Sequence, residues 1–368
     1  MQISRFAQLA AVVAVGAIAL SGCASNEDNA GSSSSSSSSD SASLTGTLKG
    51  SGSSAQDSAQ SAWISGFQQA NTGVTINYSP DGSGAGVDAF TGGGVQYAGS
   101  DAALTTAQLS AGGFKACAAD STAMDLPVYI SPIALVYNVK GVSDLNLDAK
   151  TIANIFNGSI TTWNDPAIKK LNPKATLPST AITAVHRSDD SGTTDNFTDY
   201  LADASKGAWG KAHSETFPFT SGEGASGTSG VIDAVTKGTG TIGYADMSQA
   251  GTLDIANVEV GGKYIAPSAT AAAADVAASP IEKGRAANDL AVDINRTPTD
   301  SADYPLVLVS YLIVCSHYSD SSVKGLVTSY ATYVASADGQ KAAASAAGSA
   351  PLSSDLSAKV TTAIAAVK

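Results

Sequence analysis

From Leu44 onward, the chain alternates between short segments with the pattern of β-strands and longer segments with the pattern of α-helices. Val74–Tyr78 alternates apolar and polar side chains, as a strand does, whereas Ala55–Ala70 carries its apolar residues at helical spacing. Tyr304–Cys315 is almost entirely apolar, which is typical of a strand covered on both faces. This alternation predicts an α/β fold with mixed sheets and flanking helices. Ligands in such folds bind where strands end and helices begin.

The same patterns predict the positions of the main elements. We expect strands at 44–49, 74–78, 95–99, 126–139, 181–186, 241–244 and 304–315. We expect helices at 55–70, 148–156, 166–171, 194–204, 231–237, 323–335 and 355–367, with further short helical stretches after 81–86 and after 101. A chain of 368 residues is long enough for about two lobes, and it shows no repeat at a solenoid or propeller period.

The first residues have the pattern of an export signal. Arg5 precedes an apolar stretch, Leu9–Leu20, which is too short for an ordinary membrane span and fits the core of a signal peptide. The small residues before Cys23 resemble a bacterial lipobox, in which the cysteine becomes the lipid-modified first residue of the mature chain. The alternative is an ordinary signal peptide that happens to contain a cysteine. We therefore expect residues 1–22 to be a lipoprotein signal peptide.

Residues 23–43 form a Ser-rich stretch that contains the unbroken serine run Ser32–Ser39. This composition cannot bury apolar area and predicts a flexible coil. After a lipid anchor, such a coil would be a tether that lets the folded body reach away from the membrane. A low-complexity tract without a role is the alternative, and both interpretations keep the stretch out of the fold.

The balance of charges excludes some classes of function. Charged residues make up 14% of the chain, and the formal net charge is −12. Cleavage before Cys23 would remove Arg5 and no acid, so the mature chain would carry one further negative charge. A protein that binds nucleic acid normally has a basic stripe, so this acidity argues against such a partner. The acidity is also unexpected for a protein that binds an anion.

Two glycine- and serine-rich loops stand between a predicted strand and a predicted helix. The first begins at Gly50 and includes Ser54, and the second begins at Asp81 and includes Ser83. The first amides of a helix are unsatisfied donors, so each loop predicts a position where backbone and hydroxyl groups can hold an anion. Taken alone, the first loop also fits a serine cap after a glycine turn, and the second fits a flexible turn. Neither loop has the spacing of a dinucleotide or Walker motif.

Two further loops add charged side chains. Asp101 closes a predicted strand, where it can cap the next helix or face an anion site. The loop from His186 contains Arg187, whose planar fork of donors suits a tetrahedral oxyanion, and Asp189, which can hold that guanidinium. The residues 191–193 (Ser, Gly, Thr) would offer amides and two hydroxyls at the start of the following helix. A surface ion pair beside a helix cap is the alternative for this loop.

In their order along the chain, GSGSS, GSGAG, GSD and HRSDDSGTTDNF resemble the loops of the PstS family, the phosphate-binding lipoproteins of phosphate-specific ABC importers. The segment TIANIFNGSITTWNDPAIKKLNP and the strand YPLVLVSYLIVC resemble other parts of that family, so the resemblance spans residues 44–368. It implies phosphate contacts from Ser54, the Ala55 backbone amide, Ser83, Asp101, Arg187, Ser191, Gly192 and Thr193. It also implies that Asp189 orients the arginine. The sequence departs from other members at Ala55, where some have an aromatic residue, and at Gly84, which cannot add a hydroxyl.

The resemblance implies a type II periplasmic-binding-protein-like fold, with the ligand in the cleft between two lobes. Residues 44–138 and 303–368 would form one lobe, and residues 139–302 the other. The lobes would close on inorganic phosphate by a hinge motion, and the permease subunits of an ABC importer would recognise the closed form. The protein would be extracytoplasmic, attached to the outer face of the bacterial cell membrane through its lipid anchor only. No cofactor or metal is expected.

The residues suggest how phosphate and sulfate are told apart. Phosphate keeps at least one proton at neutral pH, and the carboxylate of Asp101 can accept that proton in a hydrogen bond. Sulfate has no such proton, so the same carboxylate would repel it.

Other functions remain open at this stage. A secreted phosphatase would also bind oxyanions, but the chain has no Gly-x-Ser-x-Gly elbow and no metal-ligand spacing around its three histidines, so we expect no enzyme. A binding protein for sulfate, molybdate or an organic phosphate, and a sensor or adhesin on the same fold, are further alternatives. Outside the cytoplasm, Cys117 and Cys315 can form a disulfide or remain two buried thiols, because the sequence does not show whether they lie close enough.

Overall fold

A computed structural model describes residues 43–368 of the chain. The predicted signal peptide, Cys23 and nearly all of the predicted tether therefore lie outside the described residues. Among residues 43–368, no helix is long and apolar enough to cross a membrane.

The main feature of the described residues is one nine-stranded mixed sheet. Along the sheet the strands follow the order β2 (Gly73–Ser79), β1 (Thr45–Gly52), β3 (Tyr97–Ser100), β12 (Val307–Cys315), β4 (Ala123–Asn138), β8 (Thr241–Asp246), β6 (Thr183–Arg187) and β7 (Glu223–Ala225), and β9 (Asp254–Ile255) pairs with β4. β1 lies parallel to β2 and β3, and β6 lies parallel to β7 and β8, whereas β4 runs antiparallel to both of its long neighbours.

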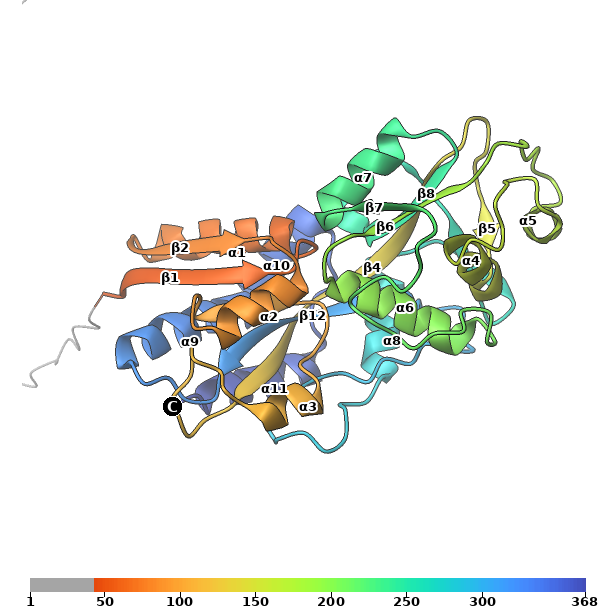
Figure 1. The fold of residues 1–368 in the computed structure, drawn as a ribbon. Helices are drawn as coiled ribbons and strands as arrows, with labels where there is room; N and C mark the ends of the chain where they lie inside the picture. Colours follow the sequence, from red (N-terminus) through yellow and green to blue (C-terminus); the bar gives the residue numbers. More distant parts are fainter. Residues whose placement is uncertain (1–42) are drawn as a thin grey trace, which may run out of the picture. The chain divides into compact units, whose positions relative to one another are not determined.

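Strand β4 joins two halves of this sheet, as Figure 1 shows. Its first part, Ala123–Pro132, pairs with β12, and its second part, Ile133–Asn138, pairs with β8. We call the half with β1, β2, β3 and β12 the first lobe and the half with β6, β7 and β8 the second lobe. The partner of β4 changes at Pro132, within the strand, whereas the sequence predicts the boundary after residue 138. That predicted boundary stays a prediction.

Helices pack on both lobes. In the first lobe these are α1 (Asp57–Ala70), α2 (Ser83–Thr91), α3 (Thr106–Ala111), α9 (Ser321–Ala335), α10 (Ala337–Ala347) and α11 (Ser354–Ala365). In the second lobe they are α4 (Ala149–Phe156), α5 (Pro166–Leu171), α6 (Gly192–Ala204) and α7 (Gly227–Lys237), while α8 (Ala269–Ala278) packs against β4 and β12. Buried aromatic side chains fill the core between helices and sheet; for example, Trp63 of α1 meets Tyr129 of β4 edge to face.

Every strand and helix predicted from the sequence overlaps one in the structure, but several elements were missed. A small sheet of β5 (Asn146–Leu147), β10 (Asn257–Val260) and β11 (Lys263–Ile265), the strands β7 and β9 of the large sheet, the 3₁₀ turn η1 (Met247–Gln249), and the helices α8 and α10 were not predicted. Both of these helices are rich in alanine, which favours a helix but produces little contrast between an apolar and a polar face. Their sequences therefore lack the apolar periodicity that predicts a helix.

Cys117 and Cys315 form a disulfide in the structure, with their Cα atoms 5.2 Å apart. The bond joins the segment before β4 to the last residue of β12 across a sequence separation of 198 residues. In the chain-entropy model, closing a loop of that length stabilises the fold by about 5 kcal/mol, because it restricts the unfolded chain. The disulfide therefore fixes the outer end of the β4–β12 pair, whose other end leads toward the second lobe.

Candidate functional site

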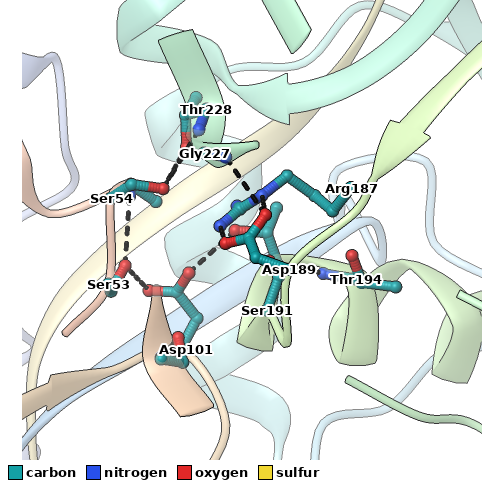
Figure 2. A network of polar contacts seen from close by, with 12 residues as sticks. Ser53, Ser54, Asp101, Arg187, Asp189, Ser191, Thr194, Gly227 and Thr228 are labelled. Carbon is teal, nitrogen blue, oxygen red and sulfur yellow. Dashed lines mark hydrogen bonds and ion pairs between the residues drawn. The ribbon is translucent and has the colours of Figure 1, made fainter. Parts of the chain in front are cut away.

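The loops singled out from the sequence meet where the two lobes face each other (Figure 2). Ser54 follows β1 and Asp101 follows β3, both in the first lobe, while Arg187 is the last residue of β6 in the second lobe. β1 and β3 are parallel neighbours, so their carboxyl ends lie at the same edge. The helices that follow the loops of Ser54, Ser83 and Arg187 are α1, α2 and α6, and the first amides of a helix have no partner within the helix itself.

Asp101 is the acidic centre of the site and is only 2% exposed. Its Oδ1 accepts hydrogen bonds from the hydroxyls of Ser53 at 2.6 Å and Ser310 at 2.5 Å. Its Oδ2 accepts one from the hydroxyl of Thr193 at 2.8 Å, and this bond joins the first lobe to the second. Among residues 43–368, no lysine or arginine forms an ion pair with Asp101. Its charge is thus stabilised by neutral hydroxyls. The alternative role as a helix cap does not apply, because Thr105 caps α3.

The start of α6 approaches Asp101 closely. Ser191 caps this helix by accepting a hydrogen bond from the amide of Thr194 at 3.3 Å. At Gly192, the next residue, a Cβ atom would lie 2.5 Å from the backbone nitrogen of Ala102. Any side chain there would push α6 away from the first lobe, so this position requires glycine. The result is that the free amides of α6 and the carboxylate of Asp101 share one small space.

Arg187 is the cation of the site and is 3% exposed. Its Nε donates to Oδ1 of Asp189 at 2.7 Å, and a second guanidinium nitrogen donates to Oδ2, so the pair is bidentate. The amide of Gly227 also donates to Asp189 Oδ1, at 3.1 Å. Burial favours the neutral acid, but the hydrogen bonds and charge of Arg187 outweigh it, so the pKa of Asp189 lies below its ordinary value. Asp189 therefore holds the guanidinium in one orientation.

Ser54 reaches across to a part of the second lobe that sequence reasoning missed. Its hydroxyl lies 2.9 Å from that of Thr228 and accepts a hydrogen bond from the Thr228 amide at 3.1 Å. Thr228 is in the first turn of α7, so a fourth helix start joins the site (Figure 2). The residues 226–230 before and within this turn (Ser-Gly-Thr-Ser-Gly) have the composition of the other loops, and that similarity was the available signal.

The two remaining predicted residues support the carboxylate loop. The hydroxyl of Ser83, at the first position of α2, accepts a hydrogen bond from the Asp101 amide at 3.2 Å. The amide of Ala55 donates to the hydroxyl of Ser53 at 3.1 Å. All the predicted site residues therefore lie in one region, and the bonds from Ser54 and Asp101 to the second lobe show that the lobes are in contact there.

This arrangement combines many donors with a single acceptor. The guanidinium, the hydroxyls and the helix amides all offer hydrogens, a set that suits an oxyanion. The carboxylate of Asp101 can only accept a hydrogen as long as it is ionised, so it favours an anion that carries a proton of its own. Among the described residues, no group of three or more His, Cys, Asp or Glu side chains is arranged to hold a metal ion.

A groove of about 740 Å³ opens beside Asp101, between α6 and the segment that contains Arg285 and Arg296. Its lining holds more acidic than basic side chains; besides Asp101, the acids are Asp190, Asp195, Asp199, Glu215, Glu282 and Asp293. Arg187 and the first turn of α6 up to Thr194 do not line this groove. It therefore reaches the site only from the side of Asp101.

Glu215 lies where this groove meets both lobes. Its carbonyl oxygen accepts a hydrogen bond from the Ser191 amide at 3.1 Å, which attaches its loop to the cap of α6. Burial, followed by the charges of the four nearby carboxylates, raises the pKa of Glu215 from 4.5 to about 7. Two of these carboxylates, Asp195 and Asp190, are in the second lobe, and the other two, Asp101 and Asp88, are in the first.

A raised pKa for an acid means that the folded protein holds the proton more tightly than the unfolded chain does. The free energy of unfolding should therefore fall as the pH rises from about 4.5 to about 7. Above about pH 7 this loss of stability is complete. We expect Glu215→Gln, which keeps the shape but not the charge, to raise the free energy of unfolding at about pH 8 by about 1–2 kcal/mol. Urea unfolding of both proteins at about pH 8 and about pH 4 tests this. Equal stabilities at the higher pH would contradict it.

A family model described as a PBP superfamily domain matches residues 37–338. The chain is 42% identical over 340 residues to the phosphate-binding protein PstS 3 of Mycobacterium tuberculosis (strain ATCC 25618 / H37Rv), covering 90% of both chains. It is 30% identical over 279 residues to the phosphate-binding protein PstS of Pasteurella multocida (strain Pm70), covering 74% of this chain and 76% of that one.

Among solved structures, the chain is similar to a periplasmic phosphate-binding protein, PfluDING, bound with phosphate, with a TM-score of 0.69 and 24% identity over 86% of this chain and 93% of the other. A phosphate-binding protein from Stenotrophomonas maltophilia matches with a TM-score of 0.70 and 21% identity over the same shares of the two chains. At this level of identity the two structures establish a shared fold.

Proposed function

Because the chain belongs to the PstS family of phosphate-binding proteins, with the two-lobed fold of the periplasmic-binding-protein superfamily, we propose that it captures inorganic phosphate and delivers it to an ABC importer. The observation that carries the proposal is the meeting of Asp101 and Arg187, from different lobes, within one set of helix starts. The relatives are named as binding proteins, and we accordingly propose a protein that binds its ligand without chemical change.

Recognition follows from the chemistry of the two charged groups. Arg187 and the amides and hydroxyls at the starts of α1, α2 and α6 hold the oxygens of the anion. Hydroxyls come from Ser54, Ser83, Ser191 and Thr193, and backbone amides from Ala55 and Gly192. The hydroxyl of Thr193 and the amide of Ala55, which donate to Asp101 and Ser53 in this structure, would turn to the ligand when it binds. Asp101 accepts the hydrogen that phosphate carries at neutral pH. Sulfate brings only lone pairs and negative charge to this carboxylate, so the site rejects it by repulsion.

The site combines residues of both lobes, so it is complete only when the lobes are together. We propose that residues 44–138 and 303–368 move as one lobe and residues 139–302 as the other, closing on the ligand by a hinge. The bonds from Asp101 to Thr193 and from Ser54 to Thr228 support this, since both would break if the lobes separated. The closed form is the one that the permease subunits would recognise.

The protein would act outside the cytoplasm. We propose that it is held at the outer face of the bacterial cell membrane by a lipid on Cys23, with residues 23–43 as a tether. The support is the order of basic residue, apolar stretch, small residues and cysteine at the start of the chain.

Calorimetry with phosphate and with sulfate at neutral pH tests the function. We expect phosphate to bind tightly and sulfate to bind about 100-fold more weakly or worse, because a like charge placed against a buried carboxylate costs several kcal/mol. Comparable affinities for the two anions would overturn the proposed discrimination, and no binding of phosphate would overturn the proposed function.

A further inference from the structure

A chain of buried hydrogen bonds leads from helix α9 to the carboxylate of Asp101. The hydroxyl of Tyr330 donates to Gln60 Oε1 at 2.8 Å, and Gln60 Nε2 donates to Gln56 Oε1 at 2.8 Å. Gln56 Nε2 donates to the hydroxyl of Ser310 at 2.5 Å, and Ser310 donates to Asp101 Oδ1 at 2.5 Å. All five side chains are at most 2% exposed. Every bond thus donates in the same direction, toward the carboxylate, and each one strengthens the next.

One backbone carbonyl determines this direction. Gln56 Nε2 also donates to the carbonyl oxygen of Tyr311 at 3.0 Å, and a carbonyl can only accept. The nitrogen of the Gln56 amide must therefore face β12, so its oxygen must face Gln60. Gln60 then has to present its nitrogen to Gln56 and its oxygen to the hydroxyl of Tyr330.

The amide of Gln56 in turn decides where the hydrogen of Ser310 points. An amide N–H can only donate, so the oxygen of Ser310 accepts from it and the single hydroxyl hydrogen is left for another acceptor. Asp101 Oδ1 lies at 2.5 Å and the carbonyl of Ser100 at 3.2 Å, so the shorter, charge-assisted bond goes to the carboxylate.

Ser53 provides a second committed hydrogen on the same oxygen. Its hydroxyl oxygen accepts from the amides of Ala55 at 3.1 Å and Gln56 at 3.3 Å, so its hydrogen is directed to Asp101 Oδ1 at 2.6 Å. Two hydroxyl hydrogens therefore point at Oδ1. Oδ2 accepts one hydrogen bond, from the hydroxyl of Thr193, so it is the oxygen that can accept a further hydrogen beside the start of α6.

We propose that Gln56 and Ser310 are positioning residues that set the anion specificity of the site, an inference that rests on the proposed phosphate function. Gln56 directs the hydrogen of Ser310 to Oδ1, where it joins the hydrogen from Ser53, and the two bonds hold the carboxylate with Oδ2 turned toward the ligand. The ligand must then bring its own hydrogen to Oδ2, which phosphate does and sulfate does not. Without the relay, Ser310 is free to turn its hydrogen to the carbonyl of Ser100, and the carboxylate of Asp101 is free to rotate.

The variant Gln56→Met tests the relay, because methionine has a similar shape and offers no donor. We expect the ratio of sulfate to phosphate dissociation constants to fall by about tenfold, the effect of one lost hydrogen bond to a charged group. Gln340→Met is the matched control. Gln340 is also a buried glutamine of the first lobe, 7% exposed, but it donates to the carbonyls of Val128 and Val334 and has no bond to the relay. Its ratio should equal that of the wild type.

Ser310→Ala and Ser310→Thr give a second, milder test. Alanine removes the last donor of the relay and should lower the ratio by about tenfold, whereas threonine keeps the hydroxyl and should restore the ratio to within about threefold of wild type. Thermal unfolding of each variant reports folding separately, and if Gln56→Met fails to fold, the pair at 310 decides.

The wild type is titrated with both anions in the same series. If it does not bind phosphate, the proposed function is wrong. If it prefers phosphate but Ser310→Ala and a folded Gln56→Met keep its ratio, the function stands and the positioning role is wrong. A fall in the ratio for Gln340→Met as large as for Gln56→Met would also overturn that role, because general loosening of the lobe would then explain the effect.

Discussion

The variant Arg187→Ala is expected to weaken phosphate binding by about 100- to 1,000-fold, because it removes the fork of donors and leaves a buried acid behind. Arg187 is 3% exposed and its bidentate partner is Asp189. Without the guanidinium, the charge of Asp189 would stand uncompensated beside the incoming anion. Calorimetry with phosphate at neutral pH measures the loss, and thermal unfolding shows whether the variant is folded.

Two further variants separate the causes of this loss. Arg187→Lys keeps the charge but not the planar fork, so we expect an affinity between those of wild type and Arg187→Ala. The double variant Arg187→Ala with Asp189→Asn removes the uncompensated acid and should recover only part of the affinity. If the double variant binds phosphate as tightly as wild type, Arg187 serves only to neutralise Asp189 and does not hold the ligand.

The variant Asp101→Asn should change the preference for phosphate over sulfate more than it changes the affinity for phosphate. The asparagine amide can donate a hydrogen to sulfate, and the repulsion from the carboxylate is gone. We expect the ratio of sulfate to phosphate dissociation constants to fall by about 100-fold, mostly through tighter sulfate binding. Calorimetry with both anions at neutral pH measures the two constants.

Asp246→Asn is the matched control for this experiment. Asp246 is also a fully buried carboxyl group at the end of a strand, and it accepts hydrogen bonds from Tyr129 and from the amide of Ser248. Burial raises the pKa of Asp246 to about 6, but none of its hydrogen bonds involves a predicted site residue. The variant Asp246→Asn should leave the ratio of sulfate to phosphate dissociation constants unchanged. An unchanged ratio in Asp101→Asn would show that Asp101 does not distinguish the two anions.

The overall acidity of the chain does not prevent the proposed binding of an anion. The formal charge is −12, and the groove beside Asp101 has more acidic than basic side chains in its lining. Charges of exposed residues are screened over about 8–10 Å at physiological salt, whereas bonds made inside a closed, dry site are not. Affinity can therefore come from helix amides, hydroxyls and one guanidinium in direct contact with the ligand, with no attraction at long range.

Much of the fold follows from local patterns. The apolar run at 304–315 predicted the buried strand β12, and the loop 186–197 predicted both the Arg187–Asp189 pair and the start of α6. These features depend on residues close together in the sequence, so one sequence is enough to find them. The start of α7 was missed, because its loop contains no charged residue to distinguish it from an ordinary turn.

The sequence by itself determined the alternation of strands and helices, the donor-rich loops and the likeness to the PstS family. Only the tertiary structure decided that Ser54 meets Thr228, that Cys117 pairs with Cys315, and that Gln56 reaches Ser310. The partners in these contacts are 174, 198 and 254 residues apart. The physical reason is that strand order and lobe packing, rather than local propensity, bring such partners within hydrogen-bonding distance. The direction of the bonds that reach Asp101 is therefore a property of the folded protein alone.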